Sequence, residues 1–66
     1  MNKANERLRS FRISLNLTKV QMSEKLGYTL SLYEKVEDGR TGASAKFMHK
    51  FKTVFPNASI EFIFFN

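Results

Sequence analysis

The chain has 66 residues, which is enough for one small domain spanning residues 1–66 and too few for two. Its 42% hydrophobic and 26% charged residues are typical of a globular protein and argue against a disordered one. Eleven Lys and Arg residues against six Asp and Glu residues give a net charge of +5, which suggests a polyanionic partner, with a merely solvated basic surface as the alternative.

The first predicted helix covers residues 4–15. Leu8, Phe11 and Leu15 are spaced at i, i+3 and i+7, which places them on one face that can pack against a core. Asn5 can cap the start of this helix. Asn16 follows its end, and Asn adopts the left-handed conformation more readily than most residues other than glycine.

A second helix is predicted to start after Thr18. The Thr18 hydroxyl can accept a backbone N–H of the first turn, and Gln21 lies where a capping box has Glu or Gln. Gly27 marks the end, because glycine readily enters the left-handed conformation that stops a helix. The expected inward face of this helix consists of Val20, Met22, Ser23 and Leu26.

A third helix is predicted at residues 30–38, after a three-residue turn. Thr29 can cap its start, and Gly39 follows its end. Its expected inward stripe consists of Leu32, Tyr33 and Val36. Two short helices joined by such a turn form a helix-turn-helix unit.

The residues after the third helix are predicted to form a loop and two further helices. Residues 38–44, DGRTGAS, are rich in glycine and small polar residues, as loops are. Ser44 can cap a fourth helix, and Ser59 can cap a short fifth one. The expected core contacts of these helices are Phe47, Phe51, Val54, Phe55, Ile60, Ile63 and Phe64. Lys46, Lys50 and Lys52 are expected to be solvated. Five helices in one domain place the chain in the all-α class.

Phenylalanine is concentrated near the end of the chain. Six of the seven phenylalanines lie at or after Phe47, and helical spacing points Phe62 and Phe65 away from the expected core. Exposed aromatic residues in a small protein often mark an interface, so we expect a dimer contact there. The alternative is that Phe62 folds back against the first or fourth helix and only Phe65 is exposed.

The sequence gives little support for catalysis. It has one histidine, His49, no cysteine, and no glycine-rich phosphate-binding loop, so neither an enzyme, a metal site nor a cofactor is expected. No apolar run approaches the ~20 residues of a membrane span, and residues 1–12 are too polar for a signal peptide. Together with the lack of cysteine, these features predict a cytoplasmic protein.

Residues 18–40 resemble the lambdoid phage repressor/Cro class of helix-turn-helix proteins, often called the XRE family. The matching features are Leu17-Thr18 at the start of the first motif helix, Glu24-Lys25-Leu26-Gly27 at the turn, and Val36-Glu37-Asp38-Gly39-Arg40 at the end of the second. The resemblance extends more weakly over nearly all of residues 6–64. It implies a compact five-helix, repressor-like domain.

The resemblance also implies that the third helix enters the major groove of DNA and presents its early residues to base edges. Lys35 could donate to guanine and Ser31 could donate or accept, while Leu30 could pack against a thymine methyl or be exposed by chance. Glu34 could accept from cytosine or repel phosphate. The family's base-reading positions thus correspond to Leu30, Ser31, Glu34 and Lys35.

Contacts to phosphate are implied on both sides of that groove. They come from the start of the second helix, where free N–H groups favour an anion, from the turn, and from the loop after the third helix. The residues concerned are Thr18, Lys19, Tyr28, Thr29, Arg40, Thr41 and Ser44. Each charged one could equally be solvated surface.

Arg12 falls among the apolar positions of the first helix. In the resembling family, an arginine here commonly pairs with a glutamate near the end of the recognition helix, which in this chain is Glu37. A bidentate pair would satisfy both groups away from water. The alternative is that Arg12 extends to solvent.

The function implied by the resemblance is sequence-specific binding of a double-stranded DNA operator by a small transcriptional regulator of a phage or mobile element. A homodimer acting as a repressor is the simplest form. One alternative is an antitoxin or another interaction protein with a protein partner, and a second is an anti-repressor-like decoy without DNA affinity. The length fits either a free-standing regulator or the DNA-binding domain of a longer one.

Overall fold

Five α-helices make up the part of the chain that the computed structural model describes, residues 4–65. In chain order they are α1 (Glu6–Ser14), α2 (Lys19–Leu26), α3 (Leu30–Glu37), α4 (Ala45–Val54) and α5 (Ile60–Phe64). No strand occurs within these residues, so the predicted all-α class is confirmed, as is the helix-turn-helix formed by α2 and α3. Residues 4–65 include no helix with the length and apolarity that a membrane span requires.

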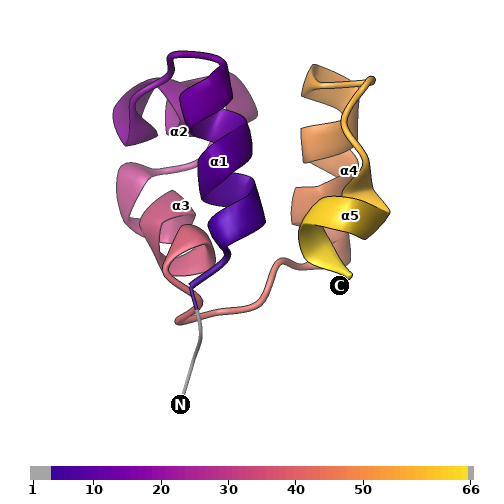
Figure 1. Cartoon of the computed structure of the whole chain (residues 1–66). Helices are drawn as coiled ribbons and strands as arrows, with labels where there is room; N and C mark the ends of the chain where they lie inside the picture. The colour runs from indigo at the N-terminus through magenta and orange to yellow at the C-terminus, as the bar shows by residue number, and fades with distance from the viewer. Residues whose placement is uncertain (1–3, 66) are drawn as a thin grey trace.

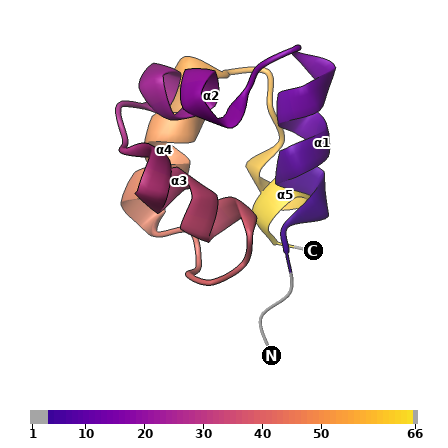
Figure 2. The same cartoon turned by 90° about the vertical axis from the view of Figure 1, so that its left-hand side faces the viewer.

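The helices form two groups that face each other across the core (Figure 1). One group contains α1, α2 and α3, the other contains α4 and α5, and the loop after α3 crosses between them. Within this arrangement α2 packs against α3 and α4, while α1 packs against α3 and α5. After a quarter turn, α2 and α3 lie toward the viewer with α4 behind them (Figure 2). The outer side of α3 is therefore left uncovered.

Each helix begins at a side-chain cap, because the first N–H groups of a helix have no partner within it. The Thr18 hydroxyl accepts from the Gln21 N–H at 3.1 Å, and the Gln21 side chain accepts from the Thr18 N–H at 2.9 Å, so the predicted capping box is present. The remaining caps are Asn5, Thr29, Ser44 and Ser59.

Left-handed residues separate the helices where the sequence predicts them. Asn16 has φ 59° between α1 and α2, and Gly27 has φ 75° at the end of α2. Gly39 has φ 78° one residue after the C-cap of α3. These residues turn the chain sharply, so that α2 and α3 can pack against each other.

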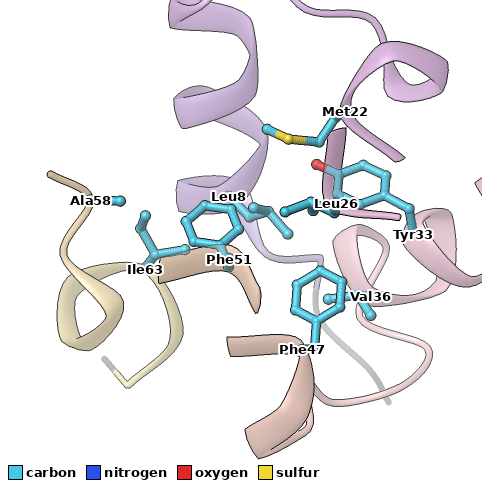
Figure 3. Packing of buried hydrophobic residues seen from close by; sticks show 9 residues of the cluster. All are labelled: Leu8, Met22, Leu26, Tyr33, Val36, Phe47, Phe51, Ala58 and Ile63. Atoms are coloured by element: carbon cyan, nitrogen blue, oxygen red, sulfur yellow. The ribbon is translucent and has the colours of Figure 1, made fainter. Parts of the chain in front are cut away.

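The core takes side chains from all five helices and from the α4–α5 link (Figure 3). Phe51 and Tyr33 are among its largest fully buried side chains, and Phe11 packs its ring against Phe51 and Phe55 at centroid distances of 5.4 and 5.2 Å. The buried apolar residues are Leu8, Met22, Leu26, Tyr33, Val36, Phe47, Phe51, Ala58 and Ile63. The expected core contacts of α4 and α5 are thus confirmed, with Val54, Phe55, Ile60 and Phe64 partly buried around this cluster.

Three residues expected to face inward are exposed instead, namely Leu15, Val20 and Leu32. α1 ends at Ser14, so Leu15 is its C-cap and the helical spacing does not extend to it. In α2 and α3 the buried stripe is narrow, because only three residues of each helix are buried. Val20 and Leu32 fall outside this stripe.

Candidate nucleic-acid interface

The uncovered side of α3 carries the four residues that the sequence predicts as base readers. Leu30, Ser31 and Lys35 are exposed, and Glu34 is half-buried beside them. Their spacing at i, i+1, i+4 and i+5 places them on one side of the helix. Leu30, with 37% of its surface exposed, lies in the first turn. The fold therefore brings the four residues together on one accessible surface, which we call the α3 face.

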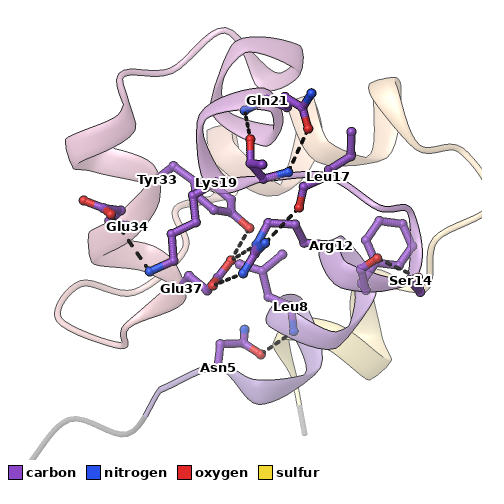
Figure 4. Close-up of polar contacts among 12 residues, drawn as sticks. Asn5, Leu8, Arg12, Ser14, Leu17, Lys19, Gln21, Tyr33, Glu34 and Glu37 are labelled. Atoms are coloured by element: carbon purple, nitrogen blue, oxygen red, sulfur yellow. Dashed lines mark hydrogen bonds and ion pairs between the residues drawn. The ribbon is translucent and has the colours of Figure 1, made fainter.

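An ion pair that the sequence does not predict joins this surface to α2. The Lys19 Nζ is 3.9 Å from the Glu34 Oε2, and both side chains are partly exposed (Figure 4). The packing of α2 on α3 creates this pair, since the two residues are distant in sequence. A surface pair of this length is weak, so a stronger anion can displace the carboxylate from Lys19.

Three of the predicted phosphate ligands are also helix caps. The hydroxyl oxygens of Thr18, Thr29 and Ser44 accept from the N–H groups of Gln21, Leu32 and Phe47. A hydroxyl that accepts in this way still has its own O–H to donate. Thr18, Thr29 and Ser44 are all exposed, so each hydroxyl can cap its helix and reach an oxyanion at once.

The loop after α3 is fixed to the end of that helix. The backbone N–H groups of Arg40 and Thr41 both donate to the Lys35 carbonyl, at 2.9 and 3.2 Å. The Arg40 Nη2 lies 3.4 Å from the Asp38 Oδ2, and both side chains remain largely exposed. Arg40 and Thr41 are therefore presented at the carboxyl end of α3 while their side chains face solvent.

Tyr28 has a packing role beside the one predicted for it. Its ring stacks on Phe47 of α4 with a centroid distance of 5.2 Å, and the residue is half-buried. This contact anchors the α2–α3 turn to α4. The sequence predicts for Tyr28 only a contact to phosphate.

The predicted ion pair of Arg12 and Glu37 is present and bidentate (Figure 4). Arg12 Nε donates to one carboxylate oxygen at 2.9 Å, and Nη2 donates to the other at 3.1 Å. The Arg12 Nη1 donates to the Leu17 carbonyl at 2.8 Å, and the Tyr33 hydroxyl donates to Glu37. Both charged groups are buried, and the network ties α1, the α1–α2 link and α3 together.

The pKa values of these groups favour the charged pair. Burial raises the pKa of Glu37, but hydrogen bonds from Arg12 and Tyr33 outweigh it and hold the pKa below its usual value. The hydrogen bond with Glu37 raises the pKa of Arg12. Burial, followed by the hydrogen bond to Glu37, raises the pKa of Tyr33. The three groups are thus held as carboxylate, guanidinium and neutral phenol.

Phe62 and Phe65 are exposed, as the sequence predicts, with 58% and 62% of their surfaces accessible. They line two different hollows. Phe62 lies beside α1, where the Arg7 guanidinium is 4.1 Å from its ring centroid and donates to the Phe62 carbonyl at 2.9 Å. Phe65 lies beside the loop after α3, near Met48. Phe62 therefore contacts α1 and is exposed at the same time.

Comparisons with protein-family models, curated proteins and solved structures find no match to this chain. The resemblance to the repressor/Cro class therefore rests on the residues quoted from the sequence and stays a prediction. Within residues 4–65, no three His, Asp or Glu side chains are grouped closely enough to hold a metal ion.

Sequence reasoning missed the part that Tyr33 has in the buried network. The signal was available, because Tyr33 and Glu37 are spaced at i and i+4 and so lie on one side of α3. The pair of Lys19 with Glu34 had no such local signal, because it depends on how α2 packs on α3.

Proposed function

We propose that this chain binds double-stranded DNA sequence-specifically and regulates transcription, with α3 in the major groove. The observation that carries this proposal is the α3 face: a mostly polar, accessible surface on the side of α3 that the core does not bury, on the second helix of a helix-turn-helix. An α-helix fits the major groove, where each base pair presents a distinct pattern of donors and acceptors.

Each residue of the α3 face offers a different contact to a base pair. The Lys35 ammonium can donate to guanine O6 and N7, and the Ser31 hydroxyl can donate or accept. Leu30 supplies an apolar surface for a thymine methyl. Glu34 can accept from cytosine N4 once Lys19 has moved to a phosphate.

The residues around the α3 face suit a DNA backbone. Hydroxyl donors cap the starts of α2, α3 and α4, Lys19 is the first residue of α2, Arg40 follows the end of α3, and the whole chain carries +5. Such contacts set the position of a protein on DNA without reading sequence. They also make binding weaken as salt rises, because neutralised phosphates release counterions.

A homodimer on a two-fold operator is the form we propose, in the cytoplasm and with repression by occupancy of a promoter. The exposed Phe62 and Phe65 are the proposed contact between subunits. Sedimentation of the wild type beside Phe62→Ser/Phe65→Ser, with and without DNA, tests this contact. If the wild type and the double variant are both folded, sediment as monomers and bind DNA with equal affinity, this contact is contradicted. By resemblance, the natural setting is a phage or mobile element.

Selection from a random pool of duplexes, followed by sequencing, tests the proposed function. We expect enrichment of a short motif that recurs as an inverted repeat, with half-sites about one helical turn apart. A protein that is folded by circular dichroism, yet enriches no motif over the input pool, would overturn the proposal.

A further inference from the structure

Beside the α2–α3 turn lies a hollow of about 360 Å³ that the proposed function does not use. Its basic wall is formed by Lys46, His49 and Lys50, which follow one side of α4 at i, i+3 and i+4. The opposite wall is formed by Leu26, Gly27 and Tyr28. We call this hollow the turn pocket.

The cations of the turn pocket have no anionic partner within the described chain. Helix α4, AKFMHKFKTV, contains no acidic residue, and among residues 4–65 no carboxylate is within ion-pair distance of Lys46 or Lys50. The one acidic residue of α2, Glu24, pairs with neither lysine. Two ammonium groups thus share one concave surface without neutralisation, and such a surface attracts an anion.

The walls of the turn pocket are held in place by packing. Tyr28 is stacked on Phe47, which lies one residue after Lys46, and this contact fixes the turn against α4. The aliphatic stem of Lys50 lies against Gly27, since its Cε is 3.8 Å from the position that a Cβ would take there. The His49 ring can donate an N–H in either protonation state.

The position of the turn pocket relates it to the α3 face. Tyr28 lines the pocket and is two residues before Leu30, the first residue of α3. Figure 2 shows the turn that precedes α3 running beside α4. A duplex whose major groove holds the start of α3 must pass a sugar–phosphate strand close to this turn.

We propose that the turn pocket binds a phosphate group, and that its source is the DNA strand flanking the groove that α3 enters. Lys46 and Lys50 neutralise the phosphate, and His49 donates a hydrogen bond to one of its oxygens. The identification of DNA as the source of the phosphate rests on the proposed function. The ability of the pocket to bind a phosphate rests on the residues of the turn pocket alone. The phosphate site extends the contact surface of the domain from α3 onto the side of α4.

The test is the salt dependence of binding to a mixed-sequence duplex, measured by fluorescence anisotropy for the wild type, Lys46→Gln and Lys50→Gln. Each lost phosphate contact lowers the slope of log Kd against log salt by about 0.9. Arg9→Gln is the matched control, because Arg9 is exposed on α1 and lines none of the described hollows. We expect both lysine variants to lower the slope and the control to leave it unchanged.

Two results of this test would overturn the inference. Slopes that are unchanged in Lys46→Gln and Lys50→Gln would show that the turn pocket does not contact DNA, while the proposed function could still stand. An equal loss of slope in Arg9→Gln would show a general effect of charge. Retained far-ultraviolet circular dichroism confirms that each variant is folded.

A second experiment titrates the protein with inorganic phosphate. It distinguishes a turn pocket that does not bind phosphate from a protein that does not bind DNA. If the wild type binds no duplex, the proposed function fails and the DNA source with it. Phosphate added at constant ionic strength should still shift the amide resonances of Gly27 and Tyr28 saturably in the wild type, and much less in Lys50→Gln. Absence of such a shift would overturn the phosphate chemistry of the pocket as well.

Discussion

The Arg12 guanidinium donates to both oxygens of Glu37 and to the Leu17 carbonyl, so one side chain joins three segments. Two buried charges are costly to remove from water, and this pair is tolerated because its hydrogen bonds are complete. No buried side-chain nitrogen or oxygen of the described residues lacks a hydrogen-bond partner. At the scale of single residues, the network is therefore the place where one substitution should have the largest effect.

Removing one partner should cost more than removing both. Arg12→Met or Glu37→Leu leaves an unpaired buried charge, and each should lower the free energy of unfolding by about 3–5 kcal/mol. In the double variant neither charge remains, so a large part of that loss should be recovered. Urea unfolding, monitored by circular dichroism, gives the free energy of unfolding of the wild type, the two single variants and the double variant. Strictly additive losses would show that the two side chains are not coupled.

The same network predicts how stability depends on pH. The pKa of Glu37 is lower in the folded state than in the unfolded state, where it is about 4.3. The contribution of the ionised Glu37 to the free energy of unfolding is therefore fully present when the pH is above the unfolded-state pKa. It is lost as pH falls through the folded pKa. The difference in unfolding free energy between the wild type and Glu37→Gln should therefore shrink as urea melts are repeated at increasingly acidic pH. A difference that stays constant would contradict the shift.

At the scale of elements, the α2–α3 unit depends on a left-handed residue at its turn. Gly27 has φ 75°, and an added Cβ would meet Lys50 only at ordinary contact distance, so the backbone conformation is the main obstacle to a larger residue. Gly42 lies in an open part of the loop, with nothing near an added Cβ and no positive φ. The two glycines form a matched pair.

Gly27→Ala should lower the free energy of unfolding by about 1–2 kcal/mol, because alanine in the left-handed region is strained. Gly42→Ala should be neutral or slightly stabilising, because alanine restricts the unfolded chain more than glycine does. Thermal unfolding of both variants beside the wild type provides the comparison. Equal effects at the two positions would mean that the turn conformation does not determine the cost.

The ion pair of Lys19 with Glu34, which joins α2 to α3, predicts how a substitution changes DNA binding. Glu34→Gln removes a negative charge from the α3 face and releases Lys19, whose Nζ is 3.9 Å away. Binding to mixed-sequence duplexes should therefore tighten several-fold, while preference at a cytosine read by Glu34 should fall. Anisotropy titrations on mixed and selected duplexes measure both. Weaker binding to every duplex would show that Glu34 does not oppose phosphate.

At the scale of the whole molecule, the sequence was most informative where structure is determined locally. Caps such as Thr18 and Ser44, and the left-handed Asn16, mark helix limits through contacts within a few residues. The buried pair of Arg12 with Glu37 also followed from the sequence, through resemblance. The element order and the all-α class were therefore predictable.

Features that depend on packing between helices were not predictable in the same way. The spacing of Val20 and Leu32 suits a wider buried stripe than these short helices have. Lys46 and Lys50 are exposed, as predicted, but the pocket that they line forms only because the α2–α3 turn packs against α4. The sequence alone also gave no sign that Phe62 and Phe65 line separate hollows.

The central claim is that α3 reads base edges in the major groove, and Lys35 tests it most directly. The measurement is the affinity of the wild type, Lys35→Ala and the control Arg9→Ala for a selected duplex and its single-base variants. We predict that Lys35→Ala weakens the preference for the selected base at one position of the half-site, by about 1–3 kcal/mol. The preference at every other position should be unchanged. Arg9→Ala should retain the full pattern. If Lys35→Ala instead weakens binding to every variant equally, Lys35 contacts phosphate, and α3 does not lie in the groove as proposed.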